Sequence, residues 1–340
     1  MSNLFDLIRL VAALAVFVSH SFPINGLHEP MILWGYTTLG SLGVSVFFGL
    51  SGYLVMQSWD RRPCIKAFLF KRIKRIFPGL IAVVCILAFV YGPAVSALKF
   101  GEYFSHSQLY IFLRMAILMG NDRLPDTLHN NPFPDAVDSS LWTLKYEFLM
   151  YIILAVLASQ TKKLTYIVES IWVVFGALNI LLWVFPGLFK LPASLLALQD
   201  PLKFTIGFGG TFFTGVVIAK YRSFLQNDMR LVLIALICFS IACFFKFGGA
   251  VAWLIIPYCV ILSGEKSYAF LLKFNPKNDI SYGMYIYAFP LQQLAVYLLG
   301  ADKSYTSFLI NSFAALLATI LFAFLSWKLI ESPFLQKRTH

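Results

Sequence analysis

The sequence predicts an all-α integral membrane protein with about ten transmembrane helices and both termini in the cytoplasm. Of its 340 residues, 59% are hydrophobic and only 13% are Asp, Glu, Lys or Arg, whereas soluble domains carry about 25% charged residues. The mean hydropathy is +0.76. A soluble protein could not bury so much apolar surface, so a soluble enzyme, a disordered chain and a nucleic-acid-binding domain are excluded. The expected surroundings are a lipid bilayer.

Ten stretches are apolar enough to cross a membrane as helices, each of which needs about 20 mostly apolar residues. The run 109–119 is shorter and contains Arg114, so we expect an interfacial or re-entrant helix within a long loop. The predicted spans are 7–23, 38–58, 76–95, 141–159, 167–186, 203–220, 231–247, 250–264, 280–300 and 306–328.

The basic residues set the predicted orientation. With the N-terminus inside, most of the 27 Lys and Arg residues fall in segments that face the cytoplasm, as the positive-inside rule requires. The longest basic stretch is the predicted inner loop 59–75. Further inner charges are Lys162, Lys163, Lys337 and Arg338. We therefore expect a multi-pass protein of the inner (plasma) membrane.

Ionisable side chains inside a membrane are costly and mark candidate functional sites. Arg9 and His20 of the first span are eleven residues apart, which puts them on one face of a helix, about 16 Å apart along its axis. Arg9, near the inner surface, can hold a phosphate or carboxylate, and His20, in the outer half, can move a proton. The alternatives are that Arg9 reaches to the lipid headgroups and that His20 makes a structural hydrogen bond.

Glu147, in the fourth span, is predicted to lie at a depth close to that of His20. A carboxylate near a histidine fixes the tautomer of its ring. The alternative is that Glu147 forms an ion pair with Lys145 of a neighbour or with Arg114.

The inner segment 71–78 carries Arg72 and Arg75, which share a face of any helix there. Such a patch suits a polyphosphate, and the alternative is orientation signal plus binding of anionic lipids. The five cysteines have no metal-binding spacing, and we expect no metal.

These motifs together resemble the acyltransferase 3 family of membrane O-acyltransferases over nearly the whole chain. The family's Arg-x10-His pattern is met by Arg9 and His20, and its Arg-x-x-Arg by Arg72 and Arg75. Four further motifs follow in the family's order: Gly-Val-x-x-Phe-Phe-x-Leu-Ser-Gly at 43–52, which ends in Ser51 and Gly52; Ser-Leu-Trp-Thr-Leu-x-x-Glu at 140–147, with Trp142; Ile-Ser-Tyr-Gly-Met-Tyr at 280–285, ending in Tyr285; and Ile-Glu-Ser-Pro at 330–333.

The chain departs from the family at one position. Many members continue the ninth-helix motif with a His, where this chain has Ala288. We expect activity to persist, because Tyr285, Tyr287 or Gln292 can supply a hydrogen bond across helices instead.

The resemblance implies one acyltransferase transmembrane domain over residues 1–340 without a fused extracytoplasmic domain, as in the stand-alone O-antigen and exopolysaccharide O-acetyltransferases. It implies an acyl-CoA donor, above all acetyl-CoA, and a glycan or lipid-linked sugar as acceptor. His20 would be the catalytic base and Glu147 would orient it. Direct transfer and an acetyl-His20 intermediate both remain open.

The remaining motif residues have implied roles in donor binding or in support of the site. Arg9, Arg72 and Arg75 would hold the CoA phosphates, and Ser51, Gly52, Trp142 and Tyr285 would support the site. The rival functions are a transporter or flippase for lipid-linked glycan and a non-catalytic partner of a polymerase. The few ionisable residues within the spans favour a single chemical site and hence an enzyme.

Overall fold

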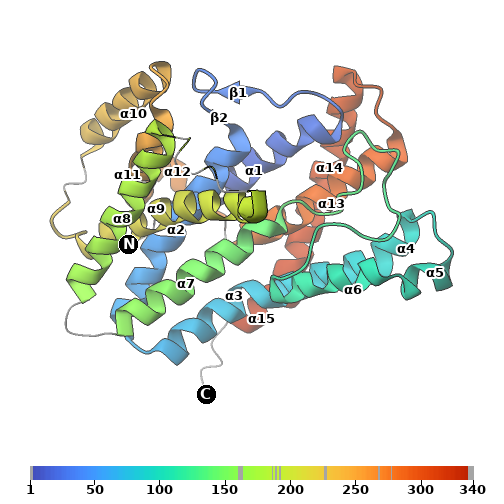
Figure 1. Ribbon diagram of the computed structural model, residues 1–340, viewed down its shortest axis with the longest axis horizontal. Helices are drawn as coiled ribbons and strands as arrows, with labels where there is room; N and C mark the ends of the chain where they lie inside the picture. The colour runs from blue at the N-terminus through green and yellow to red at the C-terminus, as the bar shows by residue number, and fades with distance from the viewer. Residues whose placement is uncertain are drawn as a thin grey trace. The chain divides into compact units, whose positions relative to one another are not determined.

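The computed structural model describes residues 3–159, 164–185, 187, 190, 193–225, 228–266, 269–276 and 278–335 (Figure 1). Within these residues nearly all regular structure is helical, and extended pairing is confined to one two-stranded ribbon and two isolated bridges. The ribbon pairs Met31 with Thr38 and Ile32 with Thr37 in antiparallel register. The predicted all-α fold is confirmed.

Ten of the described helices have 16 residues or more. They are α1 (Phe5–Ile24), α2 (Leu39–Arg61), α3 (Ile65–Ile86), α7 (Leu144–Ser159), α8 (Leu164–Val184), α9 (Gln199–Lys220), α10 (Met229–Phe244), α11 (Gly248–Glu265), α13 (Ser281–Leu299) and α14 (Tyr305–Ser326). The shorter elements are β1 (Met31–Ile32), β2 (Thr37–Thr38), α4 (Gly92–Val95), α5 (Phe100–Ser105), α6 (Ser107–Leu113), α12 (Ala269–Leu272), α15 (Ser332–Leu335), the 3-10 turns Arg114–Ile117, Leu141–Thr143 and Ala193–Leu198, and the π-helical turns Leu87–Tyr91 and Trp327–Glu331.

The ten long helices overlap the ten predicted spans. Among the described residues, eight segments are long and apolar enough to cross a membrane, and they correspond to α1, α2, α3, α7, α8, α9, α11 and α14. α10 has only 16 residues, and α13 carries Pro290 and two glutamines within its 19 residues. The chain is therefore a multi-pass membrane protein, whereas ten spans and cytoplasmic termini stay predictions.

Some residues behind the predicted topology lie outside the described ones. These are Pro186, at the end of the fifth predicted span, and the basic residues Lys162, Lys163, Lys277, Lys337 and Arg338.

The segment 59–75 is not the loop that we predicted. α2 continues to Arg61 and α3 begins at Ile65, so Arg72 and Arg75 lie on a helix. The prediction was wrong because it took a run of charges for a loop, although Lys and Arg are good helix formers and no Gly or Pro interrupts 65–77. The spacing of three residues places the two arginines on one face of α3, as expected.

The run 109–119 is helical, as predicted, but not to its end. α6 covers its first part, a 3-10 turn follows, and Leu118 then adopts a left-handed conformation with φ of 65°. The turn reverses the chain ahead of Gly120. Its position at a membrane interface stays a prediction.

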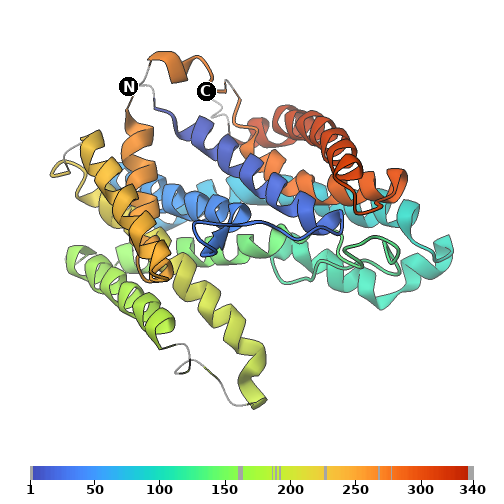
Figure 2. The same cartoon turned by 90° about the horizontal axis from the view of Figure 1, so that it is seen from above.

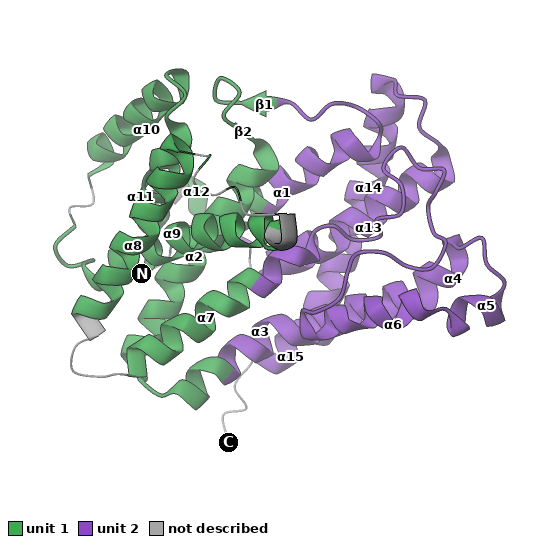
Figure 3. Ribbon diagram, viewed as in Figure 1, with its two compact units in different colours: residues 1–12, 31–69, 146–275 green, residues 13–30, 70–145, 276–340 purple. Residues whose placement is uncertain are grey.

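The chain divides into two compact units, which Figure 3 colours separately. Unit 1 comprises residues 1–12, 31–69 and 146–275, and unit 2 comprises residues 13–30, 70–145 and 276–340. In unit 1, α2 packs against α9, and α11 packs against α10, beside which it runs in Figure 2. In unit 2, α13 packs against α14, and a Cβ atom on Gly283 would lie 2.8 Å from Cα of Ala323.

Candidate active site

The first helix carries Arg9 and His20. Because α1 is continuous from Phe5 to Ile24, the two residues have the helical spacing that gives them a common face. Arg9 is half-buried, and its Nη1 lies 3.5 Å from Oδ1 of Asp6. A partly exposed pair of this kind contributes little to stability. Its effect is to hold the guanidinium near the start of the helix.

His20 is packed but incompletely hydrogen-bonded. Its ring meets Phe289 of α13 edge-on, with 5.3 Å between the ring centroids. Its Nδ1 atom is buried and has no hydrogen-bond partner within the described part of the chain. Buried polar atoms normally have a partner. The structural hydrogen bond that we considered as the alternative role is therefore not made through Nδ1, and the role of His20 in proton transfer stays a prediction.

The hydrogen bond across helices comes from Gln292, one turn beyond Ala288. The Nε2 atom of Gln292 donates to the carbonyl oxygen of Phe17 at 2.7 Å and to Oγ of Ser21 at 2.6 Å. Ala288 itself is buried and packs against Phe17 and Ala315. Gln292, one of the three residues that we expected to supply a hydrogen bond across helices, thus joins α13 to α1.

Glu147 lies in a cluster of hydroxyl groups in unit 1. Its Oε1 accepts a hydrogen bond from Oγ of Ser51 at 2.7 Å and another from the hydroxyl of Tyr151. The Ser51 and Tyr151 oxygens are themselves 2.6 Å apart. Two predicted residues, Ser51 and Glu147, are therefore brought together. Tyr151 was missed, although its spacing of four residues from Glu147 on a helix was a usable signal.

Gly52 sets how closely α2 approaches α9. A Cβ atom on Gly52 would lie 2.0 Å from the carbonyl oxygen of Phe212, and one on Gly215 would lie 2.1 Å from the carbonyl oxygen of Gly49. The two backbones are in direct contact, as small residues allow in membrane helices. This contact fixes the position of Ser51, the neighbour of Gly52, and hence of the hydroxyl that Glu147 accepts from.

Tyr285 anchors the turn that carries Trp142. Its hydroxyl donates to the carbonyl oxygen of Ser140 at 2.9 Å and lies 2.6 Å from Oγ1 of Thr143. Oδ1 of Asp138 accepts the N–H of Ser140 at 3.0 Å. Asp138 is completely buried, and this burial raises the pKa of its carboxyl group well above the usual range. Tyr285 therefore holds the turn before α7 in place, while its role in the reaction stays a prediction.

Arg75 is paired with a carboxylate that the sequence did not indicate. Its Nη2 lies 2.5 Å from Oδ2 of Asp279, and the two side chains are 23% and 14% exposed. The guanidinium also lies over the ring of Tyr282, 5.8 Å from its centroid. Arg72 lies one turn earlier on the same helix and is half-buried. A phosphate at Arg75 would share the guanidinium with Asp279.

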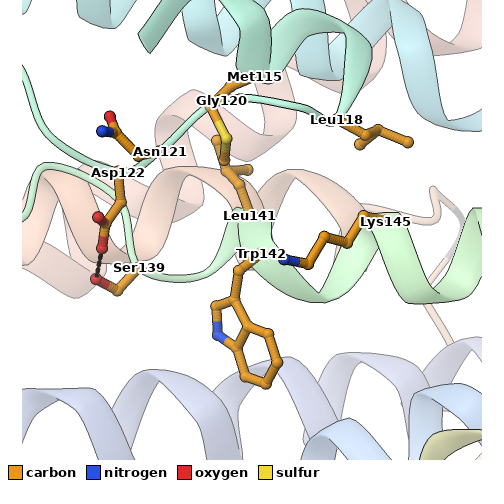
Figure 4. Close-up of a pocket in the computed structure, with 9 residues that line it drawn as sticks. All are labelled: Met115, Leu118, Gly120, Asn121, Asp122, Ser139, Leu141, Trp142 and Lys145. Carbon is orange, nitrogen blue, oxygen red and sulfur yellow. Dashed lines mark hydrogen bonds between the residues drawn. The ribbon is translucent and has the colours of Figure 1, made fainter. Parts of the chain in front are cut away.

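A pocket of about 330 Å³ lies beside the turn that Tyr285 anchors (Figure 4). Its polar lining comes from Asn121 and Asp122 of the loop and from Ser139, Trp142 and Lys145 at the start of α7. The remaining lining residues are Met115, Leu118, Gly120 and Leu141. The sequence singled out Trp142 but not the two loop residues that line the pocket with it.

Comparison with known proteins places the sequence in a family. The sequence model described as "Acyltransferase domain", of the acyltransferase 3 type, matches residues 3–328. The chain belongs to this acyltransferase family. The resemblance drawn from the motifs is therefore confirmed.

Two curated relatives are similar to this acyltransferase. An "O-acetyl transferase" of Shigella phage Sf6 is 31% identical over 348 residues, which cover 99% of this chain and 97% of the relative. "Nodulation protein 10" of Rhizobium leguminosarum bv. viciae is 32% identical over 167 residues, 47% of this chain and 45% of the relative. No solved structure matches the chain. The family and the full-length relative together show a membrane O-acyltransferase.

Proposed function

We propose that this O-acyltransferase moves an acetyl group from cytoplasmic acetyl-CoA to a hydroxyl of a surface glycan or of its lipid-linked precursor. The observation that carries the proposal is the similarity to the phage O-acetyl transferase over 99% of the chain. Use of a cytoplasmic donor assigns the protein, within the proposal, to the inner (plasma) membrane.

His20 is the proposed catalytic base. The acceptor oxygen attacks the carbonyl carbon of the thioester while its proton passes to His20, the carbon–sulfur bond breaks, and the CoA thiolate takes up that proton. A buried Nδ1 without a partner in the described chain supports this role. A two-step route, with the acetyl group carried on His20 before the acceptor oxygen attacks, balances equally well.

Glu147 is proposed to support the same reaction as a fixed carboxylate, with Ser51 holding it through the 2.7 Å hydrogen bond. Arg9, Arg72 and Arg75 are proposed to bind the phosphates of CoA, for which guanidinium groups are suited. The ion pair with Asp279 keeps Arg75 oriented in the absence of donor. The donor itself is a substrate, and the proposal requires no metal.

The test is an assay of the purified protein in liposomes, with radiolabelled acetyl-CoA and lipid-linked glycans as acceptors. Label should appear in the glycan, and His20→Asn should reduce the rate about 10²–10⁴-fold, the usual effect of removing a general base. His28→Asn, which changes an exposed histidine outside the helix, is the matched control. Transfer that is unaffected by His20→Asn would contradict its role.

The same assay separates the open alternatives. Label that collects on wild-type protein and leaves when acceptor is added would favour the two-step route, and its absence in a rapid quench would favour direct transfer. Movement of glycan across the liposome membrane without any acetylation would instead favour the flippase and overturn the proposed function.

A further inference from the structure

We propose that the pocket between the loop at Asn121–Asp122 and the start of α7 binds one sugar residue of the acceptor, an inference that rests on the proposed function. Its volume of about 330 Å³ is at the lower end of small-molecule sites, which run from roughly 300 to 1,000 Å³. This size suits a single pyranose ring. The donor, a much larger molecule, does not fit it.

The two loop residues offer complementary hydrogen-bonding groups. Oδ1 of Asn121 already accepts from Nε2 of Gln108 at 2.8 Å and from the N–H of Arg123 at 3.3 Å, which leaves its amide N–H groups for a ligand. Asp122 accepts from Oγ of Ser139 through Oδ2 at 2.5 Å, which leaves Oδ1 as an acceptor. A donor beside a carboxylate acceptor matches two adjacent sugar hydroxyls, each of which both accepts and donates.

Trp142 and Lys145 complete the lining from the other side. In Figure 4 the ammonium end of Lys145 extends toward Trp142, and the indole of Trp142 points away from Asn121 and Asp122. An indole offers the flat apolar surface against which the C–H face of a pyranose packs. An ammonium group adds a donor for a further oxygen.

The walls of the pocket are held by backbone contacts, so the site is formed before any ligand arrives. The N–H of Val137 donates to the carbonyl oxygen of Asp122 at 2.7 Å. A Cβ atom on Gly120 would lie 2.5 Å from the backbone nitrogen of Met115, so only glycine lets the loop fold back this closely. A preformed site avoids the entropy cost of ordering a loop on binding.

The mixture of charges argues for a polyol over other ligands. A polyphosphate or fatty acid carboxylate would face the like charge of Asp122, which costs binding energy. An acyl chain would bury Asn121 and Asp122 without hydrogen bonds, which is also unfavourable. A neutral or weakly charged sugar can satisfy the hydrogen-bonding groups of both residues.

The experiment compares Asp122→Asn and Asn121→Ala with wild type in the acetylation assay. The KM for the glycan acceptor should rise on the order of tenfold in each, since each loses one or more hydrogen bonds, while the KM for acetyl-CoA stays unchanged. Asp122→Asn keeps the size of the side chain and an acceptor for Ser139, which protects the fold. Asn130→Ala, an exposed asparagine in the same loop, is the matched control and should leave both constants unchanged.

A second measurement does not depend on activity. Thermal unfolding is measured in the presence of methyl glycosides of hexoses, 6-deoxyhexoses and N-acetylhexosamines. One class of glycoside should raise the melting temperature of wild type and of Asn130→Ala, and it should raise the melting temperature of Asp122→Asn by a smaller amount. Acetyl transfer with an unchanged acceptor KM in both pocket variants would overturn the sugar site and leave the proposed function standing. Sugar protection that Asp122→Asn weakens, in a protein that acetylates none of the acceptors, would keep the site and overturn the proposed function.

Discussion

Replacement of Gly52 by alanine should destabilise unit 1 and displace Ser51. The added Cβ atom would lie 2.0 Å from the carbonyl oxygen of Phe212, 2.9 Å from its carbonyl carbon and 3.3 Å from its Cα. Real Cβ atoms essentially never approach closer than 3.0 Å, so α2 and α9 must separate by about 1 Å at this point. The obstacle is backbone, which cannot rotate away as a side chain can.

The magnitude follows from two opposing effects. Overpacking of a well-packed contact costs about 1–3 kcal/mol, and a backbone obstacle on a long helix belongs at the upper end. Exchange of glycine for alanine within a helix returns up to about 1 kcal/mol. We expect a net loss of about 2 kcal/mol, together with weaker activity, because the hydrogen bond from Ser51 to Glu147 is 2.7 Å long and would be stretched.

The assay is thermal unfolding of the detergent-purified variant beside Gly207→Ala. Gly207 lies on α9, the same helix that Gly52 contacts, and a Cβ atom there would have nothing within 4 Å. Gly207→Ala should therefore be neutral or slightly stabilising, whereas Gly52→Ala should melt several degrees below wild type. A wild-type melting temperature for Gly52→Ala, or an equal loss in both variants, would refute the argument from the close contact.

Three further predictions concern groups that titrate or carry charge. Glu147→Gln should lower turnover and shift the pH profile of the remaining activity. Tyr151→Phe keeps the carboxylate and removes one hydrogen-bond donor to it, so it should reduce turnover less. Full activity with an unchanged pH profile in Glu147→Gln would mean that Glu147 has only a structural role. Arg75→Ala should raise the KM for acetyl-CoA, by an amount equivalent to roughly 1.5–3 kcal/mol for lost charge-assisted bonds, and a rise confined to the acceptor KM would contradict donor binding. Burial raises the pKa of Asp138, so the folded state binds more protons than the unfolded state, and this group's contribution to stability falls as pH rises from about 4 toward the folded pKa. Asp138→Asn should flatten that part of the dependence of melting temperature on pH. An unaltered slope would show that Asp138 is not the source of the pH dependence.

The hydrophobic pattern was sufficient to predict the long helices. The continuous apolar runs behind α1 and α14 can be accommodated only as helices in a membrane, because every backbone group must be hydrogen-bonded within its own segment. The start of α3 was missed because the apolar runs that mark membrane spans do not extend into a charged stretch. In such a stretch only the helix propensity of the residues indicates that a helix forms. α3 therefore extends eleven residues further toward the N-terminus than the predicted span, to Ile65.

The partners of the site residues were harder to predict than the residues themselves. The Arg-x-x-Arg motif indicated Arg75 as a candidate site residue. Its partner Asp279 lies 204 positions away, and no sequence spacing links the two residues. Asn121 and Asp122 form a pocket with Trp142 only because Leu118 takes a left-handed conformation and Gly120 permits a close reversal. Such juxtapositions depend on the tertiary fold of one loop, which single residues do not reveal.

The hydrogen bonds of the two ionisable residues suggest how their work is divided. Oε1 of Glu147 accepts hydrogen bonds from the hydroxyl groups of Ser51 and Tyr151, and hydrogen bonds of this kind favour a carboxylate that stays in place. His20 differs, because its Nδ1 is buried with no partner in the described chain. A group that must accept a proton from substrate needs an unengaged nitrogen, whereas a group that supplies a fixed negative charge needs donors around it. Within the proposed function this contrast favours His20 over Glu147 as the base. One turn beyond Ala288, Gln292 supplies the contact between α13 and α1.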